Sequence, residues 1–375
     1  MEITKKTRYI YVDNLRLVMI VFVVMVHLAC TYSSIGSWYY YEKKTLDDLS
    51  LILFAFFQSF SQAYFMGFLF LLAGFFVPAV YDKKGFGKFI KDRFIRLGIP
   101  TLIYMLIIHP FIIIILLGNP WEFTYLKYIT SLTFIGESGP LWFAFALLIF
   151  TFVYGVIRLL LNNCRERVEK ALPNLKLSII IILIIGIGSF LIRLIQPIGT
   201  SIMNMQLCFF TQYIVFFIGG ILAYRNKWFD KLTYSTGINW LKAALTIGIA
   251  TWIGILMLGG AMTNGFDAFM GGLRWQSFAY TIWEAFIVVA MSFGLIALFK
   301  EKWHHQNKIG KILSDNAFGV YVFHAPIIIA ITILFKSWSI LPIVKFFIMG
   351  IICLPTCFLI SHLIIRRIPL LKKVI

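Results

Sequence analysis

The sequence is poor in charge, and acidic residues are the scarcest part of it. Only 13% of the 375 residues are Asp, Glu, Lys or Arg, and 16 acidic residues face 34 basic ones. A soluble domain carries about 25% charged residues, whereas 60% of this chain is apolar. The composition therefore excludes an ordinary soluble domain and predicts a protein that crosses a membrane many times.

Cysteine is also scarce, with five residues scattered along the chain. Cys353 and Cys357 are one helical turn apart in an apolar run that has no neighbouring His or Asp, which is typical of buried small side chains. We therefore expect neither a disulfide framework nor a metal site. The chain also has no linker rich in proline and serine and no clear repeat, so we expect one integral-membrane domain over residues 1–375 and no appended soluble domain.

Long apolar windows, in contrast, are abundant. A hydrocarbon core of about 30 Å requires roughly 20 consecutive apolar residues in a helix. Windows of this length lie near residues 10–32, 50–80, 97–118, 139–161, 177–195, 205–224, 243–260, 277–299, 313–335 and 341–365. The predicted fold is an all-α polytopic membrane protein with about ten transmembrane helices.

The net charge of +18 is distributed unevenly between the connecting segments. Most Lys and Arg residues fall in alternate segments, beginning with the N-terminal one, and basic residues concentrate on the cytoplasmic side of a membrane. This pattern predicts a multi-pass protein of the cell membrane with both termini in the cytoplasm. Because topology accounts for the basic charge, we expect membrane lipids and no nucleic acid as partners.

The first span carries three ionisable residues, Asp13, Arg16 and His27. Residues 11 apart on a helix lie within about 20° of one face and about 16.5 Å apart along the axis. Arg16 and His27 therefore share a face, and Asp13 is one turn from Arg16, close enough to pair with it. Ionisable groups at membrane depth are expensive and usually face a bundle interior or a wet cavity. The stripe predicts a functional path, although snorkelling of Asp13 and Arg16 and a structural hydrogen bond of His27 are alternatives.

A basic amphipathic segment, residues 84–100, precedes the third span. Lys88, Arg93 and Arg96 alternate there with aromatic and aliphatic residues, and Pro100 follows. Two guanidinium groups at i,i+3 suit a phosphate-bearing ligand. Ordinary positive-inside anchoring is the alternative reading of the same residues.

Several further polar residues are predicted at membrane depth or at its outer edge. Glu137 precedes the fourth span, Glu284 lies well inside the eighth, and His324 lies mid-span before Pro326, which leaves backbone groups unpaired. His109 and His362 are predicted at helix ends, and His362 is expected to be structural.

Five short motifs, in order over nearly the whole chain, resemble those of the membrane acyltransferase-3 family. The family typically has Arg and His eleven residues apart in the first span, then FLLSGFF, an Arg-x-x-Arg-x-x-x-Pro element, LWF, and Y-x-x-H-x-P. The corresponding residues here are Arg16 with His27, FLLAGFF at 70–76, Arg93 with Arg96 and Pro100, Leu141 with Trp142 and Phe143, and Tyr321 with His324 and Pro326.

The resemblance implies an acyl-CoA-dependent O-acyltransferase. Such a protein takes an acyl group, often acetyl, from cytoplasmic acyl-CoA and delivers it to a hydroxyl of an envelope glycan, lipid or similar acceptor. The site roles expected on this basis are His27 as the catalytic residue with Asp13 and Arg16 beside it, Arg93, Arg96 and Lys88 at the CoA, and Glu137, Trp142, Glu284 and His324 at the acceptor.

Two departures and one alternative accompany this interpretation. Ala73 replaces a common Ser of the family pattern. We also expect no attached extracytoplasmic hydrolase-like domain, although some relatives pass the acyl group to one. Intramembrane Asp, Arg, His and Glu also mark transport paths. A permease or exporter of a small solute or polysaccharide is therefore the second hypothesis.

Overall fold

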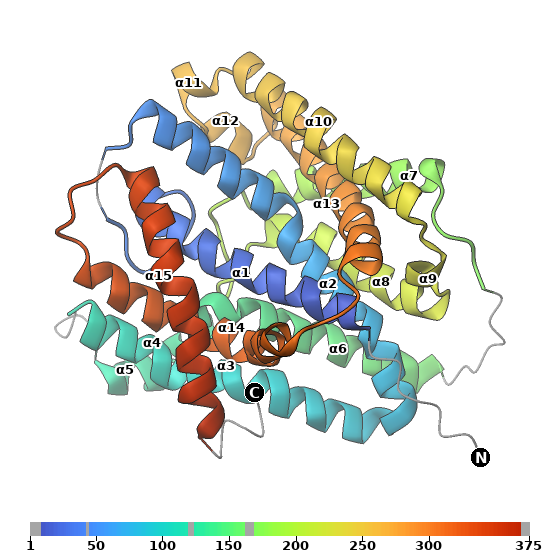
Figure 1. The fold of residues 1–375 in the computed structure, drawn as a ribbon, viewed down its shortest axis with the longest axis horizontal. Coiled ribbons are helices and arrows are strands. Elements are labelled where there is room, and N and C mark those ends of the chain that lie inside the picture. The colour runs from blue at the N-terminus through green and yellow to red at the C-terminus, as the bar shows by residue number, and fades with distance from the viewer. Residues whose placement is uncertain (1–8, 43–44, 119–123, 162–168, 369–375) are drawn as a thin grey trace.

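The computed structural model describes residues 9–42, 45–118, 124–161 and 169–368, and within them the chain forms a bundle of helices with no strand. Nine helical segments in these ranges are long and apolar enough to cross a membrane. The predicted all-α polytopic membrane fold is thereby confirmed. The helices described below follow the order of the chain and carry the labels of Figure 1.

The first of them, α1 (Ile10–Ser33), runs through the middle of the bundle (Figure 1). It packs against α2 (Asp48–Arg93), α13 (Trp275–Lys302), α14 (Lys308–Leu334) and α15 (Pro342–Leu363). Neighbours on several sides make α1 a buried helix, and a polar side chain on it must find its partners inside the protein. His27 accordingly lies against other helices, whereas the side chains of Asp13 and Arg16, near the start of α1, keep exposures of 20% and 39%.

The longest segment, residues Asp48–Leu116, makes two crossings. A straight helix of its 69 residues would measure about 104 Å, more than three times the thickness of a bilayer core. Gly85 breaks it with φ 68° and ψ 172°, a conformation that favours glycine. After this break the chain turns back across the bundle, as the blue-to-cyan ribbon of Figure 1 shows, so the nine segments supply the predicted ten crossings.

Its returning half alternates α- and π-helical turns. Short α-helices α3 (Ile99–Ile103) and α4 (His109–Phe111) separate π turns at Phe94–Gly98, Tyr104–Ile108 and Ile112–Leu116. The N–H groups of Ile99 and His109, each just before a proline, bond five residues back. Proline cannot donate and its ring crowds the preceding turn, and π turns often occur at functional sites. His109 follows the second of these turns directly.

The remaining helices complete the bundle around α1. They are α5 (Tyr125–Thr130), α6 (Trp142–Leu161), α7 (Leu175–Arg193), α8 (Phe210–Arg225), α9 (Trp228–Lys231), α10 (Tyr234–Leu258), α11 (Ala261–Asn264) and α12 (Asp267–Met270). Glycines allow two of the closest approaches. A Cβ at Gly220 of α8 would lie 2.1 Å from the carbonyl oxygen of Leu71, and one at Gly237 of α10 would lie 2.1 Å from the Cβ of Ala297. Small residues at such positions are typical of helix pairs in membranes.

The prediction that the cysteines are buried is confirmed for those in the described residues. Cys30, Cys208, Cys353 and Cys357 are buried and have free thiols, and Cys164 lies outside the described residues. They contribute to packing as small apolar side chains.

Candidate active site

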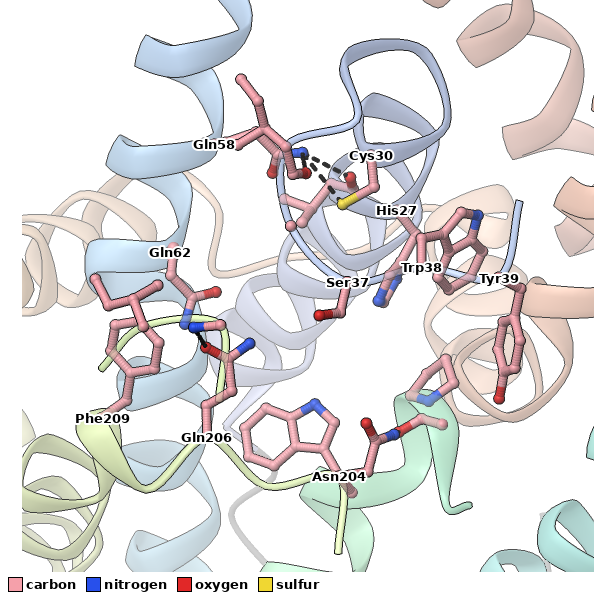
Figure 2. Close-up of a pocket in the computed structure, with 18 of the residues that line it drawn as sticks. His27, Cys30, Ser37, Trp38, Tyr39, Gln58, Gln62, Asn204, Gln206 and Phe209 are labelled. Atoms are coloured by element: carbon pink, nitrogen blue, oxygen red, sulfur yellow. Dashed lines mark hydrogen bonds between the residues drawn. The ribbon is translucent and has the colours of Figure 1, made fainter. Parts of the chain in front are cut away.

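A large, partly open cavity lies at the end of the bundle where α1 ends, which we call the cavity end. Its volume is about 1250 Å³. The walls come from α1, α2, α6 and α8 and from the loops around residues 34–39, 124–140 and 198–209. Figure 2 shows His27 on one side of this space and Gln62, Gln206 and Phe209 on the opposite side. Such a volume fits a small-molecule ligand.

His27 is half-buried and its ring is held on three sides. Its Nδ1 lies 2.9 Å from the carbonyl oxygen of Val23, one turn earlier on α1. The same nitrogen lies 3.1 Å from Nε2 of His324, on α14. The indole of Trp38, from the loop after α1, stacks on the imidazole with ring centroids 4.3 Å apart. The sequence predicted His27 as the reacting group, and the structure places it in the wall of the cavity.

A second polar cluster lines the same cavity. His109 Nδ1 lies 3.3 Å from the hydroxyl of Tyr39 and 3.7 Å from a carboxylate oxygen of Glu137. Tyr104 donates a hydrogen bond of 3.1 Å to the Tyr39 hydroxyl. Gly139, at φ +49°, makes room for this cluster, since a Cβ there would lie 2.3 Å from the Tyr39 oxygen.

The two members of this cluster that lie in loops are in a desolvated environment. Burial raises the pKa of the Tyr39 phenol, so that it stays neutral. Burial also raises the pKa of Glu137 above its usual range. Both groups can therefore exchange hydrogen bonds with a ligand that carries hydroxyl groups.

Amide side chains and aromatic rings form the rest of the lining. Gln58 and Gln62 project from one face of α2, and Gln62 donates to the hydroxyl of Tyr213 over 3.3 Å. Asn204 donates to the carbonyl of Gly139 over 2.9 Å. Trp142 stacks on Tyr213, with ring centroids 5.6 Å apart, and lines the cavity, while its expected role at the acceptor stays a prediction. Neutral donors and acceptors beside flat apolar faces suit an uncharged polar ligand.

The opposite end of the bundle, where α1 begins, gathers basic side chains, and we call it the basic end. Arg16 pairs with Asp13 at 3.6 Å, as the spacing predicted. Arg16 and Arg96 both lie close enough to Arg93 to interact with it electrostatically. Three neighbouring guanidinium groups repel one another unless an anion lies between them.

Other residues of the basic end determine how much of its positive charge is not neutralised by nearby acidic groups. Arg93 keeps its buried Nε without a hydrogen-bond partner among the described residues. Lys88 is exposed on the same segment. Asp92, the nearest acidic residue of the segment, forms an ion pair with Lys84. The described part of this end can hold a phosphate-bearing ligand.

The basic end and the cavity do not share lining residues. The first residue of α1 in the cavity wall is Val23, and Arg16, Arg93 and Arg96 are not part of that wall. Seven residues separate Arg16 from Val23, a rise of about 10 Å. The continuous path from the arginines to His27 stays a prediction, because the cavity covers only the part of α1 from Val23 onward.

Two residues that the sequence analysis predicted at the acceptor, Glu284 and His324, are not part of the cavity wall. Glu284 of α13 pairs with Arg193 of α7 over 2.5 Å, and both side chains are buried. Neither residue lines the cavity, and the role of Glu284 at an acceptor stays a prediction. His324 is fully buried behind His27 and contacts that residue instead. His362, expected to be structural, lies 3.3 Å from Asn316.

The sequence analysis did not predict that Trp38, Tyr39 and His109 line the cavity. Trp38 and Tyr39 lie in a short loop whose path depends on the helices around it, so no local pattern marks them. The pair Gln58 and Gln62, one turn apart in an apolar helix, was the signal in the sequence for a polar cavity wall.

The comparisons with known proteins agree with this architecture. The comparison with curated proteins and the comparison with solved structures each returned no match. A family model described as an acyltransferase domain, that of the acyltransferase-3 family, matches residues 9–362, nearly the whole chain. The chain is therefore a member of the acyltransferase-3 family of membrane acyltransferases.

Proposed function

We propose that this membrane acyltransferase transfers an acyl group, acetyl in the first instance, from acyl-CoA to a hydroxyl of an acceptor in the cavity. The observation that carries the proposal is the position of His27, an imidazole at membrane depth in the wall of a large polar cavity. Imidazole changes its protonation near neutral pH and is the commonest general base. An acyltransferase accounts both for the position of His27 and for the family to which the chain belongs.

The proposed donor site is the basic end. Arg93, Arg96 and Arg16 lie together there, and Lys88 is exposed beside them, so that the phosphates of CoA would neutralise their mutual repulsion. Arg16 and His27 are about 16 Å apart along α1. The long arm of CoA would cross this distance and bring its thioester to the imidazole.

The proposed acceptor is a neutral polyhydroxylated molecule, such as an envelope glycan or the sugar of a glycolipid. The cavity offers amide groups from Gln62, Asn204 and Gln206 and flat faces from Trp38 and Trp142. Sugar rings use both, because their hydroxyls form hydrogen bonds and their C–H faces pack on aromatic rings. Glu137 lies at the edge of the same site.

In the proposed reaction a single histidine handles the proton that is transferred. His27 removes the proton of the acceptor hydroxyl while the oxygen attacks the thioester carbonyl carbon. A new C–O bond forms, the C–S bond breaks, and the CoA thiolate takes the proton back from the imidazolium. The ester stays on the acceptor, and the histidine returns to its neutral form.

We also propose that the cavity end faces outward from the cell membrane and that both termini lie in the cytoplasm. The distribution of Lys and Arg among the connecting segments supports this orientation. The donor would then bind from the cytoplasm, and the acceptor would be modified on the outer side.

The test uses cells that lack the protein, complemented with wild type, His27→Ala or His362→Ala. Mass spectrometry of envelope glycans and lipids should show an acyl mass in wild-type cells and in the His362→Ala control, and none with His27→Ala. A general base contributes about 10²–10⁴-fold to a rate, so the loss should be nearly complete. Full acylation with His27→Ala would overturn the proposal, and solute uptake by proteoliposomes without acyl-CoA would favour transport instead.

A further inference from the structure

Two histidines from distant parts of the chain meet at the wall of the cavity. His27 on α1 and His324 on α14 have ring centroids 5.0 Å apart, and Nε2 of His324 lies 3.1 Å from Nδ1 of His27. His324 is fully buried, so its only route of action is through the groups that it touches. The question is which nitrogens carry hydrogen.

The carbonyl groups beside the two rings answer it. A carbonyl oxygen can only accept a hydrogen bond. Nδ1 of His324 lies 2.8 Å from the carbonyl oxygen of Tyr321, and Nδ1 of His27 lies 2.9 Å from that of Val23. Both Nδ1 atoms must therefore carry the hydrogen, and in neutral rings both Nε2 atoms carry a lone pair.

This assignment gives each ring a distinct part. Nε2 of His324 presents its lone pair to the Nδ1–H of His27, which it shares with the carbonyl oxygen of Val23. Nε2 of His27 is left with a free lone pair, and this ring lines the cavity. A proton taken up by His27 therefore binds Nε2, while the bonds at Nδ1 hold the ring in place.

The pair accepts one proton at a time. If both rings were protonated, Nε2–H of His324 would point at Nδ1–H of His27 over 3.1 Å, and two positive charges would face each other in a buried site. A carboxylate usually orients a catalytic histidine. Here the neutral imidazole of His324 takes that place, which suits the depth because a buried carboxylate is costly in a membrane.

We propose that His324 is a positioning residue that fixes His27 in the Nδ1–H tautomer and leaves Nε2 as the base that faces the cavity. The inference rests on the proposed function for the role of the base, but the tautomer can be measured without any activity. Trp38 completes the arrangement by stacking on the His27 ring, where an aromatic face stabilises the imidazolium.

The kinetic test compares His324→Phe, His324→Asn and the control His362→Phe, with acyl transfer from acetyl-CoA by purified protein. His324→Phe keeps a flat ring but removes one of the two acceptors of the His27 Nδ1–H and leaves only the carbonyl oxygen of Val23. We expect kcat to fall about 10- to 100-fold, a part of what a positioned base contributes, while KM for acetyl-CoA stays within about twofold. His324→Asn places an amide oxygen near the same position and should recover at least part of kcat. His362→Phe should behave as wild type.

The structural test is ¹⁵N NMR of the full-length protein labelled on histidine, in nanodiscs at a pH where the rings are neutral. The signals of His27 and His324 are assigned by their loss in His27→Phe and His324→Phe. Wild type should show one protonated Nδ1 and one unprotonated Nε2 for each ring. His27 in His324→Phe keeps only the Val23 carbonyl oxygen as acceptor of its Nδ1–H, so a measurable population of the second tautomer should appear.

Two results would overturn the positioning role. The first is a His27 ring of wild type with hydrogen on Nε2, and the second is unchanged kcat together with an unchanged tautomer in His324→Phe. If the tautomers are as assigned but His27→Ala is fully active, the proposed function fails and the hydrogen-bond assignment stands.

Discussion

Lys345, at the start of α15, forms an ion pair that the protein buries almost completely. Its Nζ lies 2.8 Å from both carboxylate oxygens of Glu42 and donates to the carbonyl oxygen of Trp338 over 3.2 Å. Glu42 lies in the connection between α1 and α2 that carries Trp38 and Tyr39 into the cavity. The pair therefore links the last long helix to the loop that covers His27.

The expected effect of breaking the pair follows from its burial. Side-chain exposures are 1% for Lys345 and 8% for Glu42. At 2.8 Å and an effective dielectric of 20 the attraction is about 6 kcal/mol, and it is offset by a desolvation cost of several kcal/mol for each ion. The net value of the pair is thus small, whereas Lys345→Met removes the cation from beside a buried carboxylate and should lower stability by about 3–5 kcal/mol.

The assay is equilibrium unfolding of the purified protein in mixed micelles, with Lys345→Met, Glu42→Gln and the double variant. The double variant removes both charges and should be clearly more stable than Lys345→Met alone. Lys227→Met is the matched control, since Lys227 pairs with Glu169 at 2.7 Å on the surface and exposed pairs contribute about 0–1 kcal/mol.

Acyl transfer should fall with Lys345→Met as the loop loses its anchor. The reasoning would be refuted if Lys345→Met unfolded within about 1 kcal/mol of wild type, or if the double variant were no more stable than that single variant. Either result would mean that the buried carboxylate finds another partner at little cost.

Three further predictions follow from single positions. Arg93→Ala should raise KM for acetyl-CoA about tenfold or more and weaken its salt dependence, as measured by initial rates at two ionic strengths, and an unchanged KM would place the CoA phosphates elsewhere. Gly220→Ala should destabilise the α2–α8 contact by at least about 2 kcal/mol, because its Cβ would lie 2.1 Å from the Leu71 carbonyl oxygen, whereas Gly219→Ala, 3.6 Å from the nearest atom, should be tolerated in the same unfolding assay. Burial raises the pKa of Glu137, so the folded state favours the protonated carboxyl and wild type loses stability as pH rises from the unfolded-state pKa to the folded-state pKa. Above that range Glu137→Gln should be more stable than wild type and should show a flatter dependence of the unfolding free energy on pH. An identical pH profile would contradict this.

The sequence predicted the order of the spans and the polar residues of the first one. A bilayer imposes a local rule, since every segment in it must be apolar and must pair its own backbone groups. The pairing of Asp13 with Arg16 is equally local, because both residues lie on one helix three positions apart, and the structure confirms it at 3.6 Å.

The family was also accessible from the sequence, and the match over residues 9–362 confirms it. The break at Gly85 was not predicted. From the sequence, residues 84–100 were predicted as a basic amphipathic segment that leads into the third span. The helical φ and ψ angles on both sides of Gly85 depend on the packing of the two halves against their neighbours.

The contacts that define the site were decided by the tertiary structure. His27 and His324 are 297 positions apart, and Arg193 and Glu284 are 91 apart. Their meeting depends on the rotation and depth of each helix, which packing against all the others sets. A periodic pattern gives the face of a helix on which a side chain lies, but it does not give the helix that this face will meet.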